Sequence, residues 1–304
     1  MGKTDGIGTM ETLAGIGAAL AWFDAQRMFL LAVPITLILY LCGRREELSR
    51  HAIQNTAATI IVMALNLVAL ALFHEDINAG AQAVYDALGI PKLPAGTWDA
   101  TPLWLVTLVA LVARDLCDYT IHRLMHQVGW LWPAHAAHHS DTHVNVFTTF
   151  RVHAAETILM SLTYIVLLTW LQMPQALPFA FALAMLHNMY VHMNVGWDHG
   201  PLKYLIASPA FHRWHHADAA EVQGKNLANI MPVWDLLFGT YHMPGRCTLP
   251  MGGLSSGLDD KNPVAIWLYP FCEWGRLASG TVRRLAGRAP REQDRTAREV
   301  MPGE

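Results

Sequence analysis

The stretch from Asp118 to His143 reads D-Y-T-I-H-R-L-M-H-Q-V-G-W-L-W-P-A-H-A-A-H-H-S-D-T-H and holds six histidines in twenty-six residues. His122 and His126 are four positions apart, so on a helix they share one face and can chelate a single ion. An H-x-x-H-H box follows at His135, His138 and His139. A lone histidine is usually a core or surface residue, but boxes with chelating spacing indicate a metal site.

The same H-x-x-H-H pattern recurs far down the chain, at His212, His215 and His216. Imidazole suits iron, zinc, copper or nickel, so the spacing alone does not select the metal. No box carries the glutamate of an H-E-x-x-H motif, which weighs against zinc hydrolysis. The boxes also differ from soluble di-iron bundles, in which Glu-x-x-His motifs dominate.

Composition indicates a membrane setting for this site. Of 304 residues, 53% are hydrophobic and only 15% are charged, whereas soluble domains carry about 25% charged residues. The net charge of −3 and the lack of a basic stripe argue against a nucleic-acid partner. The four isolated cysteines predict neither a disulfide framework nor a thiolate zinc site.

Apolar segments along the chain predict four or five membrane helices, and no signal peptide is expected. The segments are residues 28–42, 57–73, 102–113, 158–173 and 176–191. Pro174 and Pro178 mark a tight turn, so the last two segments form a hairpin whose ends lie on the histidine side.

Charge asymmetry predicts the sidedness of the site. The loop from Arg44 to Arg50 is basic and the loop 74–100 is acidic, so the positive-inside rule places the first in the cytoplasm and the second outside. The histidine stretch then lies on the cytoplasmic face. Twelve of the twenty-one Lys and Arg residues follow Val191, which agrees with this topology. The Arg-rich sequence from Ser279 onward predicts a disordered or membrane-surface tail.

Five motifs of the sequence together resemble the fatty acid hydroxylase / sterol desaturase superfamily. They are D-Y-T-I-H-R-L-M-H, L-W-P-A-H-A-A-H-H-S, V-H-M-N-V, S-P-A-F-H-R-W-H-H-A-D and N-I-M-P-V-W-D-L-L-F-G-T-Y, which cover roughly residues 103–245. Members of that family are integral membrane enzymes that use O2 and a histidine-ligated di-iron centre at the cytosolic face to hydroxylate or desaturate lipids. The first hundred residues carry no motif of the family.

The resemblance implies a set of metal ligands. They are His122, His126, His135, His138, His139, His192, His212, His215 and His216. Nine or ten imidazoles exceed what one ion binds, so two metals are expected, and their identity as two Fe ions is carried over from the family. His187 is an additional possible ligand, although a position five residues before His192 turns it about 140° away on an ideal helix. The alternative for His187 is a buried, hydrogen-bonded core residue.

Other residues are predicted to support the site. Asp118 is four residues before His122 and is expected to accept its second ring N–H. Trp214, inside the third box, is expected to wall off the metals, although such tryptophans are as often membrane-belt residues. His153 and Glu156 lie in R-V-H-A-A-E, which resembles a family stretch, and could support the ligands. Trp234-Asp235 and Phe238-Gly239 are expected to dock the C-terminal cap under the site.

We therefore expect an all-α integral membrane protein with four or five transmembrane or hairpin helices and a cytoplasmic histidine-rich helical cap. The expected regions are an N-terminal membrane region (1–100), a hydroxylase-like catalytic region (101–250) and a partly disordered cytoplasmic extension (251–304). A multi-pass protein of a bacterial inner membrane is the expected location.

The expected activity is hydroxylation of a membrane lipid, such as a fatty acyl chain, sterol or aminolipid, with O2 and a separate cytochrome- or ferredoxin-type electron donor. Lipid or sterol desaturation and ether-lipid monooxygenation are alternatives within the family. A membrane metallohydrolase, which works without O2, and a metal transporter, which needs ligands near mid-membrane, are the alternatives outside it.

Overall fold

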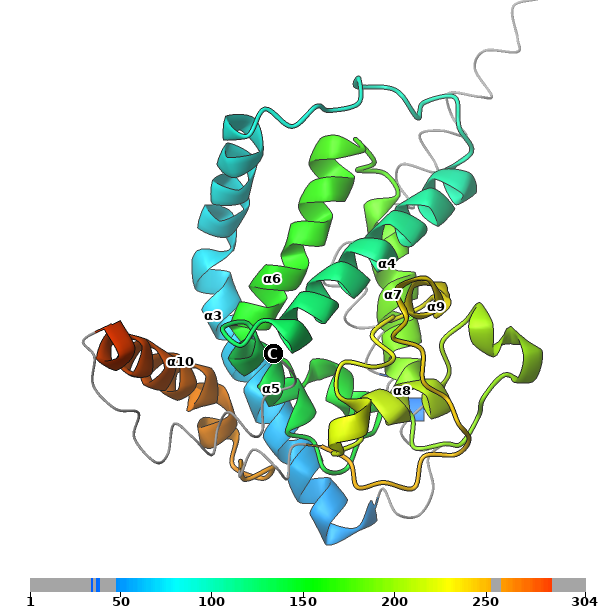
Figure 1. The fold of residues 1–304 in the computed structure, drawn as a ribbon. Helices are drawn as coiled ribbons and strands as arrows, with labels where there is room; N and C mark the ends of the chain where they lie inside the picture. Colours follow the sequence, from blue (N-terminus) through cyan, green and yellow to red (C-terminus); the bar gives the residue numbers. More distant parts are fainter. Residues whose placement is uncertain (1–33, 35–36, 39–47, 253–257, 286–304) are drawn as a thin grey trace, which may run out of the picture. The chain divides into compact units, whose positions relative to one another are not determined.

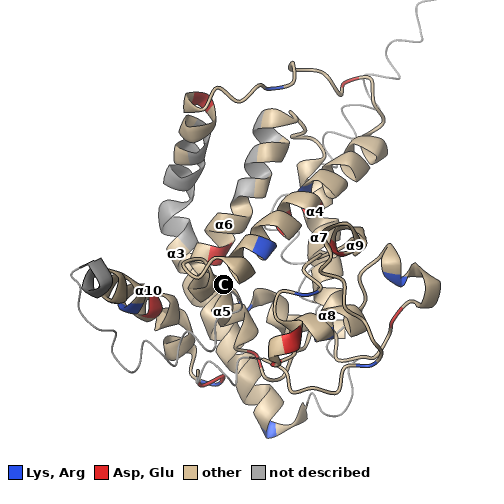
Figure 2. Ribbon diagram, in the orientation of Figure 1, with Lys and Arg blue, Asp and Glu red and all other residues tan. Residues whose placement is uncertain are grey.

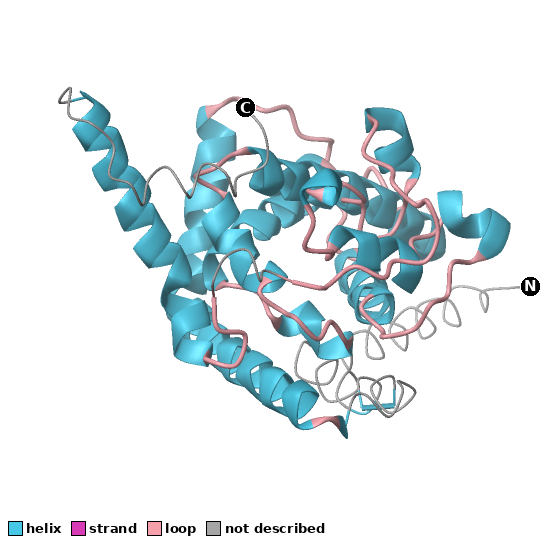
Figure 3. Cartoon of the chain, turned by 60° about the horizontal axis from the view of Figure 1, so that its bottom comes forward, coloured by secondary structure: helices cyan, strands magenta, loops and turns pink. Residues whose placement is uncertain are grey.

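The structure, a computed structural model, describes residues 34, 37–38, 48–252 and 258–285. All the helices below belong to the unit formed by residues 39–304. Within the described ranges the chain is helical and has no β-strand, only an isolated bridge between Ala217 and Met251 (Figure 3). The predicted all-α class is confirmed for these ranges. The predicted segment 28–42 and the tail beyond residue 285 fall almost wholly outside them.

The longest helix is α3 (Arg50–Ala87). Ser49 caps its N-terminus, because the Ser49 hydroxyl accepts the N–H of Ala52 at 3.1 Å. Part of α3, Arg50–Ala69, is the one described helix that is long and apolar enough to cross a membrane. One face of this part is nevertheless polar and buried, with Asn55 and Asn66 turned into the protein.

Three helices form the scaffold that carries the site: α4 (Leu103–Gln127), α6 (Ala154–Ile165) and α7 (Leu177–Val191). α6 and α7 each pack against α4 (Figure 1), and α6 continues as a π-helical turn over Val166–Trp170. At the end remote from the histidines, Val106 and Ala110 of α4 pack against Leu167, Met173 and Ala180 in a buried apolar cluster.

The α6–α7 pair is the hairpin that the sequence predicts. α6 begins two residues before Glu156 and α7 ends one residue before His192, so both ends of the hairpin meet the histidines. Figure 2 shows that the pair is almost without charged residues, with Glu156 the acidic residue of α6. Both helices are shorter than the roughly 20 residues that span a bilayer. The number of spans therefore stays a prediction.

Short helices and loops form a cap around the histidines. They are α5 (Trp132–His139), η2 (Val146–Phe150), η4 (Gly200–Tyr204), α8 (Pro209–His215), η5 (Ala220–Val222), α9 (Val233–Phe238) and α10 (Pro263–Leu285). Prolines start several of them: in α8, Pro209 follows Ser208, whose hydroxyl accepts the N–H of Phe211 at 3.1 Å. Such caps allow helices of two turns or fewer to hold a fixed position.

The fully buried guanidinium of Arg151 ties this cap to α3. It donates to the Asn55 side chain at 3.3 Å, to the Thr59 hydroxyl at 3.2 Å and to the Ser140 hydroxyl at 2.9 Å. A further bond reaches the carbonyl of Asp260 at 2.7 Å. Burial lowers the pKa of Arg151, yet these neutral acceptors satisfy its donors. Ser140 follows the second histidine box directly, so Arg151 also holds the end of α5.

Candidate metal centre

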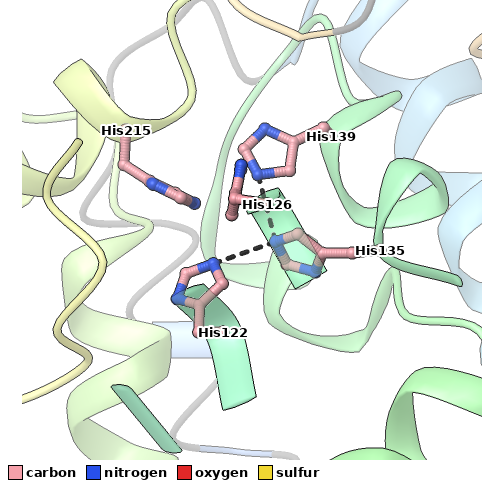
Figure 4. A group of neighbouring side chains, drawn as sticks. All are labelled: His122, His126, His135, His139 and His215. Carbon is pink, nitrogen blue, oxygen red and sulfur yellow. Dashed lines mark hydrogen bonds between the residues drawn. The ribbon is translucent and has the colours of Figure 1, made fainter. Parts of the chain in front are cut away.

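The eight histidines of the three boxes assemble with His192 into two buried groups. The first, called the five-histidine group, consists of His122 and His126 from α4, His135 and His139 from α5, and His215 from α8. One ring nitrogen of each lies within 4.8 Å of the others. Figure 4 shows the five rings converging on one point, with Nε2 of His135 lying 2.9 Å from Nε2 of His122 and 3.1 Å from Nε2 of His139.

The second, called the four-histidine group, consists of His138, His192, His212 and His216. His192 is central in it, because its Nε2 lies 3.3 Å from Nε2 of His138, 3.0 Å from that of His212 and 3.2 Å from that of His216. The two groups adjoin each other, since the rings of His139 and His216 stack with centroids 4.8 Å apart.

Each H-x-x-H-H box contributes to both groups. In α5 the pair four residues apart, His135 and His139, enters the five-histidine group, while His138 enters the other. The third box does the reverse: His212 and His216 enter the four-histidine group and His215 the five-histidine group. On a helix, a residue at i+3 is rotated away from the line that joins i and i+4. A single short helix can therefore supply two adjacent sites.

Backbone carbonyls determine which nitrogen of several rings faces inward. Nδ1 of His122 donates to the Leu227 carbonyl at 2.7 Å, and Nδ1 of His215 donates to the Lys225 carbonyl at 2.9 Å. In the other group, Nδ1 of His192 donates to the Asn188 carbonyl at 2.7 Å. A carbonyl can only accept, so each of these neutral rings must present the Nε2 lone pair to the interior. This arrangement is typical of metal-binding histidines.

Burial keeps these imidazoles neutral. The pKa values of His135, His138 and His139 lie well below the usual histidine range, first because burial disfavours the cation and then because neighbouring histidines repel it. Burial likewise lowers the pKa of His192 to about 4. Neutral imidazole is the form that binds a metal.

The free nitrogens show that the groups fit metal ions. Both ring nitrogens of His126, and Nε2 of His215, are buried without a hydrogen-bond partner, and each such atom costs about 1–3 kcal/mol if left unsatisfied. Two nitrogens bound side by side on one ion at about 2.1 Å lie about 3.0–3.4 Å apart. The closest pairs of inward nitrogens in the two groups are 2.9–3.3 Å apart, and all the nitrogens of a group lie within 4.8 Å of one another. The donor set therefore suits one metal ion per group.

His187 is not part of either group. It lies one turn before His192 on α7, where its ring packs against Tyr190 at 5.8 Å. Of the ten predicted ligands, the structure therefore brings nine together and leaves His187 apart, since a position five residues before His192 is rotated about 140° away on an ideal helix.

The predicted role of Asp118 is wrong. The N–H of His122 is taken by the Leu227 carbonyl, and the Asp118 carboxylate instead forms an ion pair with Arg114 at 3.3 Å. Asp118 also bonds with Thr163 of α6 and with Asn229. It is thus a buried link between helices. The supporting carboxylate belongs to Glu156, whose Oε1 lies 2.9 Å from Nδ1 of His135.

The predicted wall formed by Trp214 is also wrong. The Trp214 indole donates to the Gly245 carbonyl at 2.7 Å and packs against His242, outside both groups. Trp214 is two positions after His212 on α8, so its side chain is rotated about 200° away from that of His212. Trp132, at the start of α5, takes the position instead, with its ring 5.2 Å from that of His126 and 5.5 Å from that of His139.

His153 does not reach the histidine groups; its Nδ1 accepts the N–H of Ala155 and caps α6.

Sequence reasoning missed the loop that orients the five-histidine group. This carbonyl loop, residues 225–228, carries the two carbonyls that accept from His122 and His215. Asp235, buried in α9, holds it by accepting the N–H groups of Leu227 and Ala228 at 2.8 and 2.9 Å. The Trp-Asp pair was expected to dock the cap, and its contacts agree, but its connection to the ligands had no signal in the sequence.

Two further contacts hold the same region. Asp115 of α4 accepts the N–H groups of Ile230 and Met231 and the Trp234 indole, each at 2.9 Å. Gly252 donates to the His216 carbonyl at 2.9 Å, and a Cβ on it would lie 2.2 Å from the carbonyl oxygen of Asp141. Only glycine therefore fits at this approach between the second and third boxes.

Comparison with known proteins gives a family for this arrangement. Residues 107–240 match the fatty acid hydroxylase family. An ornithine lipid hydroxylase of Rhizobium tropici is 31% identical over 196 residues, which are 64% of this chain and 57% of that protein. An alkylglycerol monooxygenase of Danio rerio is 28% identical over 52% of this chain and 34% of its own length, and that of Homo sapiens is 27% identical over 57% and 37%.

The chain thus spans between about a third and somewhat over half of the length of these relatives. No solved structure matches it significantly. The matched segment begins in α4 and ends just after α9, so it contains all nine converging histidines and the carbonyl loop. Through this segment, the chain is similar to the fatty acid hydroxylase family.

Proposed function

We propose that this protein is an oxidoreductase that hydroxylates a C–H bond of a membrane lipid with O2. The observation that carries the proposal is the pair of adjacent, buried, all-histidine groups. Iron bound there would activate O2 for attack on an unactivated C–H bond. The balanced reaction takes the lipid, O2, two electrons and two protons to the alcohol and water. The electrons would come from a separate donor of cytochrome or ferredoxin type.

The chain's own residues would hold and shield two irons. Neutral Nε2 atoms of His122, His192 and His215 face inward because backbone carbonyls take the opposite nitrogens. The Trp132 ring lies against the five-histidine group and would exclude water from that side. The groups lie where α4 and the α6–α7 hairpin end. If the hairpin is embedded in the cytoplasmic membrane as predicted, a lipid could reach the metals from the bilayer.

The relatives suggest the class of lipid. One is named for ornithine lipid and others for alkylglycerol, so an aminolipid and an ether lipid are the first substrates to test. Ether-lipid monooxygenation is favoured as the second candidate because several relatives carry that name. Hydroxylation of the carbon beside the ether oxygen would likewise consume O2 and two electrons.

A metallohydrolase fits the site less well. Among the described residues, no carboxylate belongs to either histidine group. The nearest one identified, Glu156, has one oxygen bound to His135, and burial raises its pKa well above the usual range. A hydrolase needs a free base to activate water. Metal transport would need ligands along a path, whereas both groups here are enclosed.

The test compares lipids from cells with and without the protein, under air and under argon, with isotopically labelled O2. We expect one oxygen atom from O2 to enter an ornithine lipid or a fed alkylglycerol under air and nothing under argon. His138→Ala should abolish the product, while His187→Gln, outside both groups, serves as the matched control. Product formed under argon, or oxygen derived from water, would refute the proposal.

A further inference from the structure

One face of α10 is apolar and exposed. Val264, Leu268 and Phe271 are 58%, 44% and 49% exposed. Their spacing of four and three residues places them on one line along the helix, which continues through exposed Gly275 and Ala278. These five residues are called the α10 stripe. Large apolar side chains gathered in this way mark an interaction surface.

The opposite face of α10 is already used. Ile266 is fully buried in a cluster with Ala58 and Val62 of α3 and Ala137 of α5. Figure 1 shows α10 beside α3 and α5, with its C-terminal end pointing away from them. The helix is therefore fixed to the protein by one face while it offers the stripe outward.

α10 does not qualify as a membrane span. Within its 23 residues it carries Glu273, Arg276, Arg283 and Arg284, and it is not among the described helices that are long and apolar enough to cross a bilayer. A helix with an apolar face and a charged edge lies in the membrane interface instead of crossing it.

The charge of the C-terminal half of α10 and the sequence after it indicates what kind of partner the stripe contacts. From Glu273 to Arg291 the sequence contains five arginines and a single acidic residue, Glu273, which forms an ion pair with Arg276 at 2.8 Å. Arg276 and Arg283 are seven positions apart, which places both on one edge of the stripe. Clusters of four to eight basic residues on an amphipathic helix are typical of binding to anionic lipid headgroups.

Aromatic residues extend the same surface. The Trp274 indole donates to the Trp130 carbonyl at 2.8 Å, which fixes the turn after α4 beside α10. The Trp130 side chain is 48% exposed. Tryptophan is enriched where a protein meets the interface between lipid and water.

We propose that the α10 stripe, with its arginine edge, lies on the surface of an anionic phospholipid bilayer. The apolar side chains enter the boundary between headgroups and acyl chains, and the arginines contact lipid phosphates. This role is independent of the reaction at the histidines. It places α5, which packs against α10, next to the bilayer.

Cys272 allows a direct test, because it is exposed beside Phe271. The other three cysteines are replaced by serine, and the full chain carries an environment-sensitive fluorophore on Cys272. The protein is reconstituted in phosphatidylcholine vesicles, with or without about one third phosphatidylglycerol. Quenching is then measured with aqueous iodide and with a lipid-borne quencher. A label at Glu221→Cys, in the exposed part of the cap, is the reference position.

In anionic vesicles the label on Cys272 should be protected from iodide and quenched from the lipid, whereas the reference label stays accessible. In Arg283→Glu the equilibrium constant for docking should fall at least about five-fold, since each arginine near the surface contributes about that factor. High salt should reproduce that loss. Equal iodide access in both kinds of vesicle and in the variant would overturn the proposal. Protection that persists in detergent and rises with protein concentration would assign the stripe to a second copy of the chain and overturn it as well.

Discussion

At the scale of single residues, the decisive property of this site is which ring nitrogen is left free. A histidine can serve as a ligand, a core residue or a helix cap, and the structure places histidines in positions that suit each of these roles. His192 turns Nε2 toward three other histidines, His187 packs on Tyr190, and His153 caps α6. The hydrogen-bond partner of Nδ1 distinguishes these roles. Where a backbone carbonyl accepts from Nδ1, the neutral ring has its lone pair on Nε2, which faces the interior of the group.

The contrast between His192 and His187 gives the first prediction. We expect His192→Gln to lose bound iron, because it removes the nitrogen at the centre of the four-histidine group. His187→Gln should keep its iron and lose only stability, because its contacts are with Tyr190. The measurement is iron per folded chain after size-exclusion chromatography. Equal iron loss in the two variants would place His187 among the ligands.

The second prediction separates the two carboxylates near the histidines. Glu156→Ala leaves Nδ1 of His135 buried without its partner, so iron affinity should fall about 10–100-fold, as for other residues that orient a ligand. Asp118→Asn breaks a buried ion pair with Arg114 and should cost about 3 kcal/mol of stability or more.

Iron bound to the folded fraction of Asp118→Asn should stay near that of the unmodified protein. Chelator competition measures the affinity, and urea titration of the same samples measures the stability. An Asp118 variant that is stable but empty of iron would show that Asp118 acts on the metal after all.

Much of the set of converging histidines could be predicted from the sequence, whereas the residues that orient their rings could not. Spacing of three and four residues identifies His122 and His126 as a pair because helix geometry is local. The partner of the second nitrogen is set by tertiary contacts, and for His122 it is a backbone carbonyl 105 residues away. Every residue carries a carbonyl, so no residue type marks that position.

At the scale of elements, the carbonyl loop connects the end of the family segment to the metal site. It runs from Lys225 to Ala228 and includes Asn226, whose φ of +53° is in the left-handed region that asparagine tolerates. The Asn226 side chain donates to the Phe211 carbonyl at 2.9 Å and accepts the N–H of His242 at 2.7 Å. Loop position therefore depends on side-chain bonds and not on a helix or strand.

The third prediction follows from this dependence. Asp235→Ala removes the acceptor of the Leu227 and Ala228 N–H groups, so the carbonyls that orient His122 and His215 lose their positions. Both histidines belong to the five-histidine group. We expect this variant to lose the iron of that group first and to retain the other ion.

Spectroscopy of the remaining iron, compared with that in His212→Ala, distinguishes the two sites, since His212 belongs to the other group. Asp198→Asn is the matched control, because that carboxylate bonds only with the N–H of Gly200 in an exposed loop, away from both groups. Equal loss of both irons in Asp235→Ala would contradict the selective role of the loop.

At the scale of the whole molecule, the helical fold was predictable from the apolar segments, whereas the membrane arrangement was only partly so. The segment 57–73 falls within α3, but α3 extends from Arg50 to Ala87, and its polar face with Asn55 and Thr59 binds Arg151. A helix can be apolar enough to cross a bilayer and still bury a polar face in the protein, and hydropathy does not distinguish these cases.

The fourth prediction concerns topology. The positive-inside rule places the cap in the cytoplasm and the loop before α4 outside. In a background without native cysteines, Thr97→Cys should react with an impermeant thiol reagent added to intact cells, and Glu221→Cys should react only after lysis. Both positions are exposed in the structure, so a lack of reaction reports sidedness and not burial. Reaction of Glu221→Cys in intact cells would reverse the assignment.

The central claim is that the two histidine groups are two iron sites, and counting metal tests it most directly. The full chain, produced with ample iron and purified without chelator, is analysed for all transition metals together with protein concentration. Because the structure contains two groups with inward nitrogens, we expect two irons per folded chain and little zinc. A single ion per chain, or zinc in place of iron, would contradict it.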